Sequence, residues 1–289
     1  MKAGFVSIFG RPNAGKSTLL NAITGEKLAI VSPKVQTTRH RIKAIITEKD
    51  YQVIFSDTPG IIEPKYKLHE RMMGAVKAAI EDADVAILLT DINEDIQEAN
   101  AVFTALSLKI PAIVVINKID KANDKKQSEV EQFFKQQPYA TEVLAISALY
   151  KPSTPYIIDT IVKYLPEGEP FFEGDELSDL PTKFFIGELI REKIFYLYKD
   201  EIPYHTTVNV NEFKEKSTLI KIVADVVVQR ETQKGIILGE RGKMIRQLGT
   251  EARKDIEQFL NQKVFLELFV KVRPKWRDND MMLKEYGYH

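Results

Sequence analysis

The sequence predicts an α/β fold with a largely parallel sheet, followed by a smaller α+β unit. Apolar runs alternate with helix-length amphipathic stretches over the first 165 residues, a pattern typical of a parallel sheet covered by helices on both faces. A glycine-containing loop directly follows the first apolar run. A segment rich in proline, glycine and acidic residues begins at residue 166. We therefore divide the chain into residues 1–165, a linker at 166–181 and a second unit at 182–289.

Length and composition fit a globular protein of two domains. The chain has 289 residues, of which 44% are hydrophobic and 28% charged, and this length is large for one compact domain. We expect no transmembrane helix and no secretory signal, because apolar runs are short and the amino terminus leads directly into a predicted strand. The absence of cysteine excludes disulfides and thiolate metal sites and is compatible with a reducing cytoplasm.

The net charge of zero conceals a mild asymmetry between the two parts of the chain. Residues 1–180 contain 21 basic and 25 acidic residues, whereas residues 181–289 contain 20 and 16. A basic second part fits a polyanionic partner and fits a solvated surface equally well.

The segment Gly10–Ser17 has the pattern G-x-x-x-x-G-K-[ST] of phosphate-binding loops. The apolar run Phe5–Phe9 precedes it and the helix-like stretch Thr18–Ile23 follows it. A strand, loop and helix in this order direct backbone N–H groups and the positive end of the helix at one anion. We expect Lys16 to reach the terminal phosphates of a nucleotide and the Ser17 hydroxyl to ligate Mg²⁺. This context disfavours a chance match in an ordinary turn.

Two strands and a second motif come next in the chain. Ser32–Arg41 is polar without a clear period and is predicted as a loop, and Ile42–Thr47 and Tyr51–Asp57 are predicted as a hairpin. Asp57 ends the second strand, where an acid suits the outer coordination of Mg²⁺. Gly60 follows within Asp-Thr-Pro-Gly and allows a backbone N–H to lie close to a γ-phosphate.

The rest of the first part alternates strands and helices. The predicted strands are Asp84–Asp91, Pro111–Ile116 and Glu142–Ile146, and the predicted helices are Asp95–Leu108, Lys126–Gln137 and Pro155–Leu165. Ligands of such sheets bind beyond the carboxyl ends of the strands. The motifs fall at these ends.

Asn117–Asp120 follows one of these strands and indicates a preference for guanine. The Asp120 carboxylate can accept hydrogen bonds from the ring N–H and the exocyclic amine of guanine, a pair that adenine lacks, so it would select GTP over ATP. Lys118 could pack its stem on the base, and Asn117 could tie this loop to the phosphate loop. Ser147–Leu149 follows the last strand, where a backbone N–H could meet the guanine carbonyl. Each motif alone is a common surface turn, but their order and placement favour a nucleotide site.

The motifs together resemble those of the translation-factor-related GTPases. The sequences GRPNAGKS, TT, DTPG, NKID and SAL occur in the order of that family and cover residues 1 to 165. The resemblance implies a Ras-like mixed six-stranded sheet with one antiparallel strand, and hydrolysis of GTP to GDP with Mg²⁺. Thr37 and Thr38 are adjacent, and the resemblance favours Thr38 as a Mg²⁺ ligand beside Ser17 and Asp57.

The resemblance also assigns residues to roles. The implied catalytic residues are Lys16, Thr38, Asp57 and Gly60. The implied nucleotide-binding residues are Asn13, Ala14, Gly15, Lys16, Ser17, Thr18, Asn117, Lys118, Asp120, Ser147, Ala148 and Leu149.

Three positions qualify this assignment. Ras-like enzymes commonly place a glutamine after D-x-x-G to position the attacking water, whereas this chain has Ile61. We therefore predict slow intrinsic turnover, with water positioned by backbone groups, a cation or a partner, or alternatively by a distant group such as Gln97. Asn13 matches an asparagine with which some relatives hold K⁺, and a loop-stabilising role is the alternative. Tyr150–Pro155 replaces a glycine-containing turn and leaves the geometry of the fifth motif open.

The second part contains one further motif within a regular order of elements. The predicted elements are a helix at Thr182–Lys199, strands at His205–Phe213, Leu219–Gln229 and Val264–Val270, and a terminal helix at Met281–Tyr286. Two apolar helical pieces flank the sequence Gly239–Gly242 between the second and third strands. A G-x-x-G turn allows close approach of a sugar–phosphate backbone, although helix–turn–helix packing is a commoner cause of the bare pattern.

With its flanking isoleucines and the order helix–strand–strand–helix–helix–strand, this part resembles a type II KH domain. The resemblance implies a groove for about four single-stranded nucleotides. The implied RNA-binding residues are Ile236, Gly239, Glu240, Arg241, Gly242 and Lys243. Ile237 and Ile245 are predicted to lie in the core or the groove floor. Trp276 lies among basic residues, and packing against the domain is favoured over stacking on a base.

A GTPase unit followed closely by a type II KH domain resembles a family of bacterial ribosome-assembly GTPases. The resemblance implies binding to the 3′ end region of small-subunit (16S-type) ribosomal RNA and assistance in 30S subunit assembly. It also implies a monomer in the cytoplasm with peripheral contact at the inner face of the cell membrane, a contact for which the sequence gives no independent sign. We predict that GTP orders Ser32–Arg41 and Gly60–Arg71 and that hydrolysis releases them. The alternatives are a nucleotide-regulated RNA-binding scaffold with incidental hydrolysis, and an enzyme that uses a KH-like domain for protein contacts.

Overall fold

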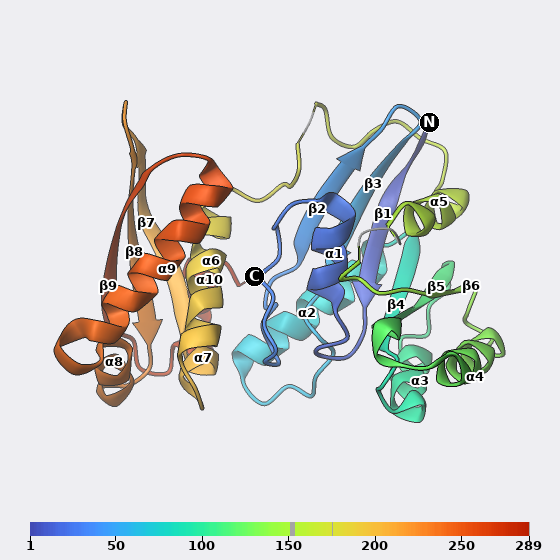
Figure 1. The fold of residues 1–289 in the computed structure, drawn as a ribbon, viewed down its shortest axis with the longest axis horizontal. Helices are drawn as coiled ribbons and strands as arrows, with labels where there is room; N and C mark the ends of the chain where they lie inside the picture. The colour runs from blue at the N-terminus through green and yellow to red at the C-terminus, as the bar shows by residue number, and fades with distance from the viewer. Residues whose placement is uncertain (151–153, 175, 289) are drawn as a thin grey trace. The chain divides into compact units, whose positions relative to one another are not determined.

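The computed structural model describes residues 1–150, 154–174 and 176–288, and the chain divides into two compact units (Figure 1). The first unit comprises Met1–Ala29, Thr38–Pro64 and Met72–Asp179, and the second comprises Ile30–Thr37, Lys65–Arg71 and Leu180–His289. Two short segments from the amino-terminal half of the sequence therefore belong to the second unit.

The first unit is built on a six-stranded sheet in the order β2-β3-β1-β4-β5-β6. Its strands are β1 (Lys2–Phe9), β2 (Ile42–Thr47), β3 (Tyr51–Asp57), β4 (Val85–Asp91), β5 (Ala112–Asn117) and β6 (Glu142–Ala145). β2 runs antiparallel to β3 and the other neighbours are parallel, which confirms the predicted mixed sheet. The central strands are almost continuously buried, as expected for apolar strands covered on both faces.

Helices connect the strands and cover the sheet. They are α1 (Lys16–Thr24), α2 (Lys67–Asp82), α3 (Ile96–Ala105), α4 (Asp124–Lys135) and α5 (Thr154–Tyr164). α1 packs against α5 and the β2–β3 end of the sheet. A hydrophobic core with Val76, Phe103 and Phe134 joins α2, α3 and α4 to the sheet. The helix α2 is absent from the sequence-based prediction.

The predicted linker belongs mainly with the first unit. The Ala3 N–H donates to the Pro166 carbonyl at 3.0 Å, and the Ile45 N–H on the edge strand β2 donates to the Leu177 carbonyl at 2.9 Å. The Gln52 side chain accepts from the N–H groups of Phe171 and Phe172 at 2.7 and 3.1 Å. The segment thus adds a backbone hydrogen bond to the edge strand β2.

The second unit packs helices on one face of a three-stranded sheet. Its main elements are α6 (Thr182–Leu197), α7 (Ile202–His205), β7 (Thr207–Glu215), β8 (Ile220–Val228), α8 (Glu231–Leu238), α9 (Lys243–Leu260), β9 (Val264–Val272) and α10 (Asp280–Glu285). β7 and β8 are antiparallel and β8 and β9 parallel, and alternate residues of β8 enter the core with α6, α8 and α9. This confirms the predicted smaller α+β domain. Trp276 is fully buried and donates to the His205 carbonyl at 2.9 Å, so it packs within the unit.

Candidate functional site

The phosphate loop Gly10–Ser17 joins β1 to α1 and buries its lysine. Lys16 is only 6% exposed, and its ammonium donates to the carbonyls of Gly10 and Arg11 at 3.1 and 3.0 Å. Burial lowers the pKa of Lys16 to about 8, against the opposing effect of nearby Asp57. A phosphate at this position would favour the charged ammonium. The loop therefore presents a positive group and the amino terminus of α1 to the same anion.

Glycine at position 15 permits a close approach between the phosphate loop and Asn117. Gly15 has a φ of 103°, and a Cβ there would lie 2.3 Å from the Asn117 amide nitrogen. A side chain at this position would strain the backbone. It would also push the loop Asn117–Asp120 away from the phosphate loop.

Two hydroxyls and a buried carboxylate converge beside Lys16. The Ser17 hydroxyl donates to Asp57 Oδ2 at 2.6 Å and lies 2.8 Å from the Thr38 hydroxyl. Asp57 is fully buried, which raises its pKa, while Lys16 and Ser17 act in the opposite direction. Its other oxygen, Oδ1, has no hydrogen-bond partner among the described residues. A buried carboxylate oxygen with spare acceptor capacity beside two hydroxyls is the hard oxygen donor set that Mg²⁺ prefers, so these residues fit the ion.

The structure distinguishes the two adjacent threonines. Thr38 lies with Ser17 and Asp57, whereas the Thr37 hydroxyl donates to the Lys34 carbonyl at 2.7 Å. The structure therefore brings Thr38 to Ser17 and Asp57, and Thr37 stabilises its own loop.

The segment after Asp57 approaches the phosphate loop through its glycine. A Cβ on Gly60 would lie 3.0 Å from the Pro12 backbone nitrogen and 2.9 Å from its side chain. The next residue, Ile61, packs against the core beneath the sheet. Gln97 is exposed in the first turn of α3. An aliphatic side chain thus occupies the position where Ras-like enzymes commonly have a water-binding glutamine.

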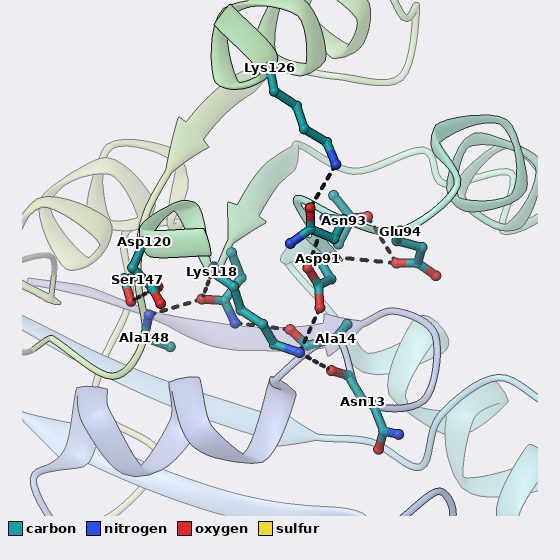
Figure 2. A network of polar contacts seen from close by, with 12 residues as sticks. Asn13, Ala14, Asp91, Asn93, Glu94, Lys118, Asp120, Lys126, Ser147 and Ala148 are labelled. Carbon is teal, nitrogen blue, oxygen red and sulfur yellow. Dashed lines mark hydrogen bonds and ion pairs between the residues drawn. The ribbon is translucent and has the colours of Figure 1, made fainter. Parts of the chain in front are cut away.

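The buried amide of Asn117 joins three loops, and its partners Ala14, Lys118 and Ala148 are labelled in Figure 2. Its nitrogen donates to the Ala14 carbonyl at 2.9 Å, and its oxygen accepts from the N–H groups of Lys118 at 2.8 Å and Ala148 at 2.9 Å. Asn117 is 1% exposed. This single side chain fixes the phosphate loop, the NKID motif and the SAL motif relative to one another.

The remaining residues of the two base-recognition motifs surround this amide. The Lys118 ammonium donates to the Asn13 carbonyl at 2.8 Å and to Asp91 at 2.7 Å. The exposed Asp120 carboxylate accepts from the Ser147 hydroxyl, which orients it. Leu149 is 68% exposed. Of the turn that departs from the family pattern, residues 151–153 lie outside the described residues.

The second unit has a tight turn between α8 and α9. Gly239 has φ and ψ of 68° and 178°, and a Cβ there would lie 2.5 Å from the Met244 side chain. Arg241 and Gly242 also have positive φ values, 49° and 73°. This run of unusual backbone conformations turns Glu240 and Arg241 outward, and both side chains are exposed.

A groove of about 330 Å³ lies beside this turn, between α9 and β9. It combines basic side chains, an exposed aromatic ring and an apolar floor. Its lining residues are Ile245, Arg246, Gly249, Thr250, Arg253, Phe265, Leu266 and Leu268. Arg246 also donates to the Arg241 carbonyl at 2.8 Å, which links the groove to the turn. Positive charge for phosphates beside an aromatic face for bases is the chemistry of single-strand recognition.

Known protein families match each unit separately, and known proteins match the whole chain. Residues 5–118 match the family model described as 50S ribosome-binding GTPase, and residues 201–277 match the KH domain model. GTPase Era of Staphylococcus haemolyticus (strain JCSC1435) is 41% identical over 291 residues, covering 99% of this chain and 97% of that protein. The chain belongs to the Era family of GTPases.

Solved structures of Era agree with this assignment. A crystal structure of a tyrosine-to-alanine variant of Aquifex aeolicus Era bound to GDP·AlF4⁻ has a TM-score of 0.95 and 39% identity, covering 100% of this chain and 99% of that chain. A structure of Era with MgGDPNP and nucleotides 1506–1542 of 16S ribosomal RNA has a TM-score of 0.94 and 39% identity, with the same coverage.

In this Era-family chain, the sequence-predicted site residues fall into two groups. Those of the nucleotide site converge at one end of the first sheet. Of the predicted RNA-binding residues, Gly239–Lys243 form the turn, and Ile236 on α8 is 49% exposed while Ile237 is fully buried.

Sequence reasoning missed Asp91 and most of the groove lining. Arg246, Gly249, Thr250 and Arg253 are spaced i, i+3, i+4 and i+7 along α9. That helical spacing places them on one face of the helix. The spacing could have indicated from the sequence which residues of α9 line the groove.

Proposed function

We propose that this protein hydrolyses GTP to GDP and phosphate, binds the 3′ end region of small-subunit ribosomal RNA and assists 30S subunit assembly. The observation that carries the proposal is the occurrence, in one chain, of a guanine-nucleotide site and a basic, aromatic groove beside the Gly239–Gly242 turn. The Era relative solved with MgGDPNP and 16S RNA nucleotides supports both halves of it.

The nucleotide chemistry follows from groups already held in place. Lys16 would stabilise the negative charge that develops on the transferred phosphoryl group, and the amino terminus of α1 would add to it. Mg²⁺, bound through Ser17 and Thr38 with Asp57 nearby, would supply further neutralisation of the phosphates. Gly60 lies against the loop at Pro12, where its N–H can serve the γ-phosphate.

Slow intrinsic turnover is part of this proposal. Ile61 is a partly buried aliphatic side chain that packs against the core and offers no hydrogen bond to water, so the attacking water depends on backbone groups, a cation or a partner. Asn13 is our candidate K⁺ ligand, and its side chain points away from the Lys118 network in Figure 2. We expect GTP turnover to rise when a small-subunit 3′-end RNA is added, and to be faster in K⁺ than in Na⁺. Equal rates in the two salts would assign Asn13 to loop stability instead.

The coupling that we propose between the nucleotide site and the RNA groove involves the loop Ile30–Thr37, which directly precedes Thr38. Ile30–Thr37 belongs to the second unit, where buried Arg191 of α6 donates to the Thr37 carbonyl and Glu192 accepts from the Val31 N–H at 3.0 Å. Thr38, the next residue, lies with the Mg²⁺-binding groups. An equilibrium that orders Thr38 with GTP would therefore act on a segment that α6 also holds.

The coupling is tested by RNA affinity of the full chain with a GTP analogue, with GDP and without nucleotide. We expect the affinities to differ by several-fold, within the range of ordinary coupling energies. Identical affinities in the three states would refute coupling at the level of binding.

The guanine assignment is tested by Asp120→Asn. An amide cannot accept both guanine N–H groups, so GTP affinity should fall by about a hundred-fold and preference should move towards XTP. Competition binding with GTP, XTP and ATP measures this. Unchanged GTP affinity would contradict the role of Asp120.

A scaffold whose hydrolysis is incidental is the second candidate, and Ile61 favours it. Turnover that stays negligible with RNA, K⁺ and ribosomal subunits present would support the scaffold. Replacing Glu240-Arg241 by Asp-Asp should abolish RNA binding on our proposal, because it replaces the cation at the turn by a second carboxylate, which repels phosphates. Retained RNA binding in that variant would favour a KH-like domain used for protein contacts.

Localisation and oligomeric state remain predictions. Among the described residues, no helix combines the length and apolar character needed to cross a membrane. Cytoplasmic residence, peripheral contact with the inner face of the membrane and a monomeric state come from the family resemblance. Size-exclusion chromatography and vesicle co-sedimentation test them.

A further inference from the structure

Asp91 lies at the carboxyl end of β4, where it faces the base-recognition loop without belonging to any of its motifs. In the sheet register Asp91 pairs with Asn117 on the neighbouring strand β5. Its Oδ2 accepts from the Lys118 ammonium at 2.7 Å, and its Oδ1 accepts from the Asn93 N–H at 2.9 Å (Figure 2). Both carboxylate oxygens are therefore engaged, and one of them is aimed at the lysine of the NKID motif.

Lys118 is held at both ends of its side chain. Its backbone adopts a φ of 63°, a conformation uncommon for a residue with a side chain, and its N–H donates to Asn117 Oδ1. Its ammonium bonds Asp91 and the Asn13 carbonyl together. A lysine side chain is otherwise flexible, with a compact charge on a long stem. Two acceptors on one ammonium keep that stem extended between the end of β5 and the phosphate loop.

The other carboxylates near this turn have partners of their own. Glu94 accepts from the Thr90 hydroxyl at 3.0 Å and pairs with Arg11 at 3.1 Å, and Asp120 accepts from Ser147. The side chains of Lys118 and Asp91 are 25% and 23% exposed. A pair this sheltered is screened less by salt than a surface ion pair.

The turn after β4 is thus linked to the phosphate loop in two ways, one direct and one through Lys118. Glu94 reaches it through Arg11, and Asp91 reaches it through Lys118 and the Asn13 carbonyl. The same turn receives the Lys126 ammonium of α4 through Asn93. Base-recognition and phosphate-recognition loops are therefore braced by one short connection between β4 and α3.

We propose that Asp91 is a positioning residue for guanine-nucleotide binding, which acts by holding Lys118 ready to pack along the base and so prolongs the time that nucleotide stays bound. The inference rests on the guanine site of the proposed function. Asp91 need not touch the nucleotide. It removes conformational freedom from Lys118 before binding, and such preorganisation appears mainly as slower dissociation.

The test is the dissociation rate of fluorescent GDP from the full chain carrying Asp91→Asn, which keeps the shape and the acceptor for Asn93 but removes the charge. We expect release to be about five- to ten-fold faster, the order of one charge-assisted hydrogen bond. Single-turnover hydrolysis of bound GTP should change by less than about two-fold, because Asp91 contacts none of Lys16, Ser17 and Asp57. Asp91→Glu restores the charge and should recover part of the retention.

Two comparisons make the result decisive. Glu98→Gln, which removes another carboxylate paired with the phosphate loop through Arg11, should leave GDP release unchanged. In a Lys118→Met background, Asp91→Asn should add no further acceleration, because its effect passes through the lysine.

Three outcomes would overturn the inference: wild-type release rates in Asp91→Asn, equal rates in Asp91→Asn and Asp91→Glu, or an undiminished effect of Asp91→Asn in the Lys118→Met background. Failure of the wild-type chain to prefer GDP over ADP would instead refute the guanine site itself, and the inference with it.

Discussion

The nucleotide site and the groove proposed to bind RNA have opposite kinds of architecture. In the first, the key side chains are buried and hydrogen-bonded to neighbouring loops: Lys16, Asp57 and Asn117 are 6%, 0% and 1% exposed. In the groove, Arg253 and Phe265 are exposed, and the basic residues stand on a rigid helix. A preorganised network of this kind suits a compact ligand, and a charged, partly apolar surface of this kind suits a flexible polymer.

The difference has an energetic consequence for mutations. Removing one member of a buried network leaves its partners unsatisfied, and that penalty falls on stability and binding together. Removing an exposed cation from a groove weakens one contact among several and leaves the fold unaffected. Substitutions should therefore have large, coupled effects in the nucleotide site and small, separable effects in the groove.

Asn117→Ala should give the largest effect. It leaves the Ala14 carbonyl and the N–H groups of Lys118 and Ala148 without their partner. We expect a loss of about 2–4 kcal/mol in unfolding free energy and a fall of at least about a hundred-fold in GDP affinity. Urea unfolding and nucleotide titration measure the two quantities.

Asn93→Ala is the matched control for Asn117→Ala. Asn93 is exposed, and its side-chain oxygen accepts from the Lys126 ammonium at the surface. We expect a change of less than about 0.5 kcal/mol. Comparable losses in both variants would mean that burial of the network does not distinguish the nucleotide site.

This contrast also explains how far sequence alone could predict each site. The nucleotide motifs were visible because a strand end followed by a loop imposes strict residue types, such as Gly15 with its φ of 103° beside Asn117. Their placement at the ends of parallel strands predicted that they would converge. The mixed six-stranded sheet was implied by the family resemblance, and the order of helices and strands in the second unit followed from its apolar pattern.

Sequence could not supply contacts that depend on packing between distant segments. Asp91 belongs to no motif, and its role needs the register of β4 against β5. The contacts of Ile30–Thr37 with the second unit, such as the hydrogen bond from Arg191 to Thr37, join residues more than 150 positions apart in the chain. The groove wall on β9 needs the parallel pairing of β8 with β9. Local pattern carries none of this information.

Gly239→Ala should have an intermediate effect and should separate the two sites. The φ and ψ of 68° and 178° lie in a region that essentially only glycine occupies, and a Cβ would lie 2.5 Å from the Met244 side chain. We expect a loss of about 1–3 kcal/mol and about ten-fold weaker RNA binding, with GDP affinity unchanged. Gly235→Ala in α8 has open space around its Cβ and should not weaken RNA binding. Equal RNA affinities for the two variants would show that the turn conformation is not required.

Arg253→Ala should have the smallest effect, and it tests the groove most directly. Arg253 lines the groove on α9, whereas its exposed neighbour Lys254 carries the same charge outside the lining. If the groove guides the RNA backbone, Arg253→Ala should weaken binding about three- to five-fold and reduce the salt slope by about one, and Lys254→Ala should do less. Binding titrations at several salt concentrations measure both. Equal effects of the two substitutions would mean that RNA binds the basic surface of α9 as a whole. That result would contradict specific binding in the groove.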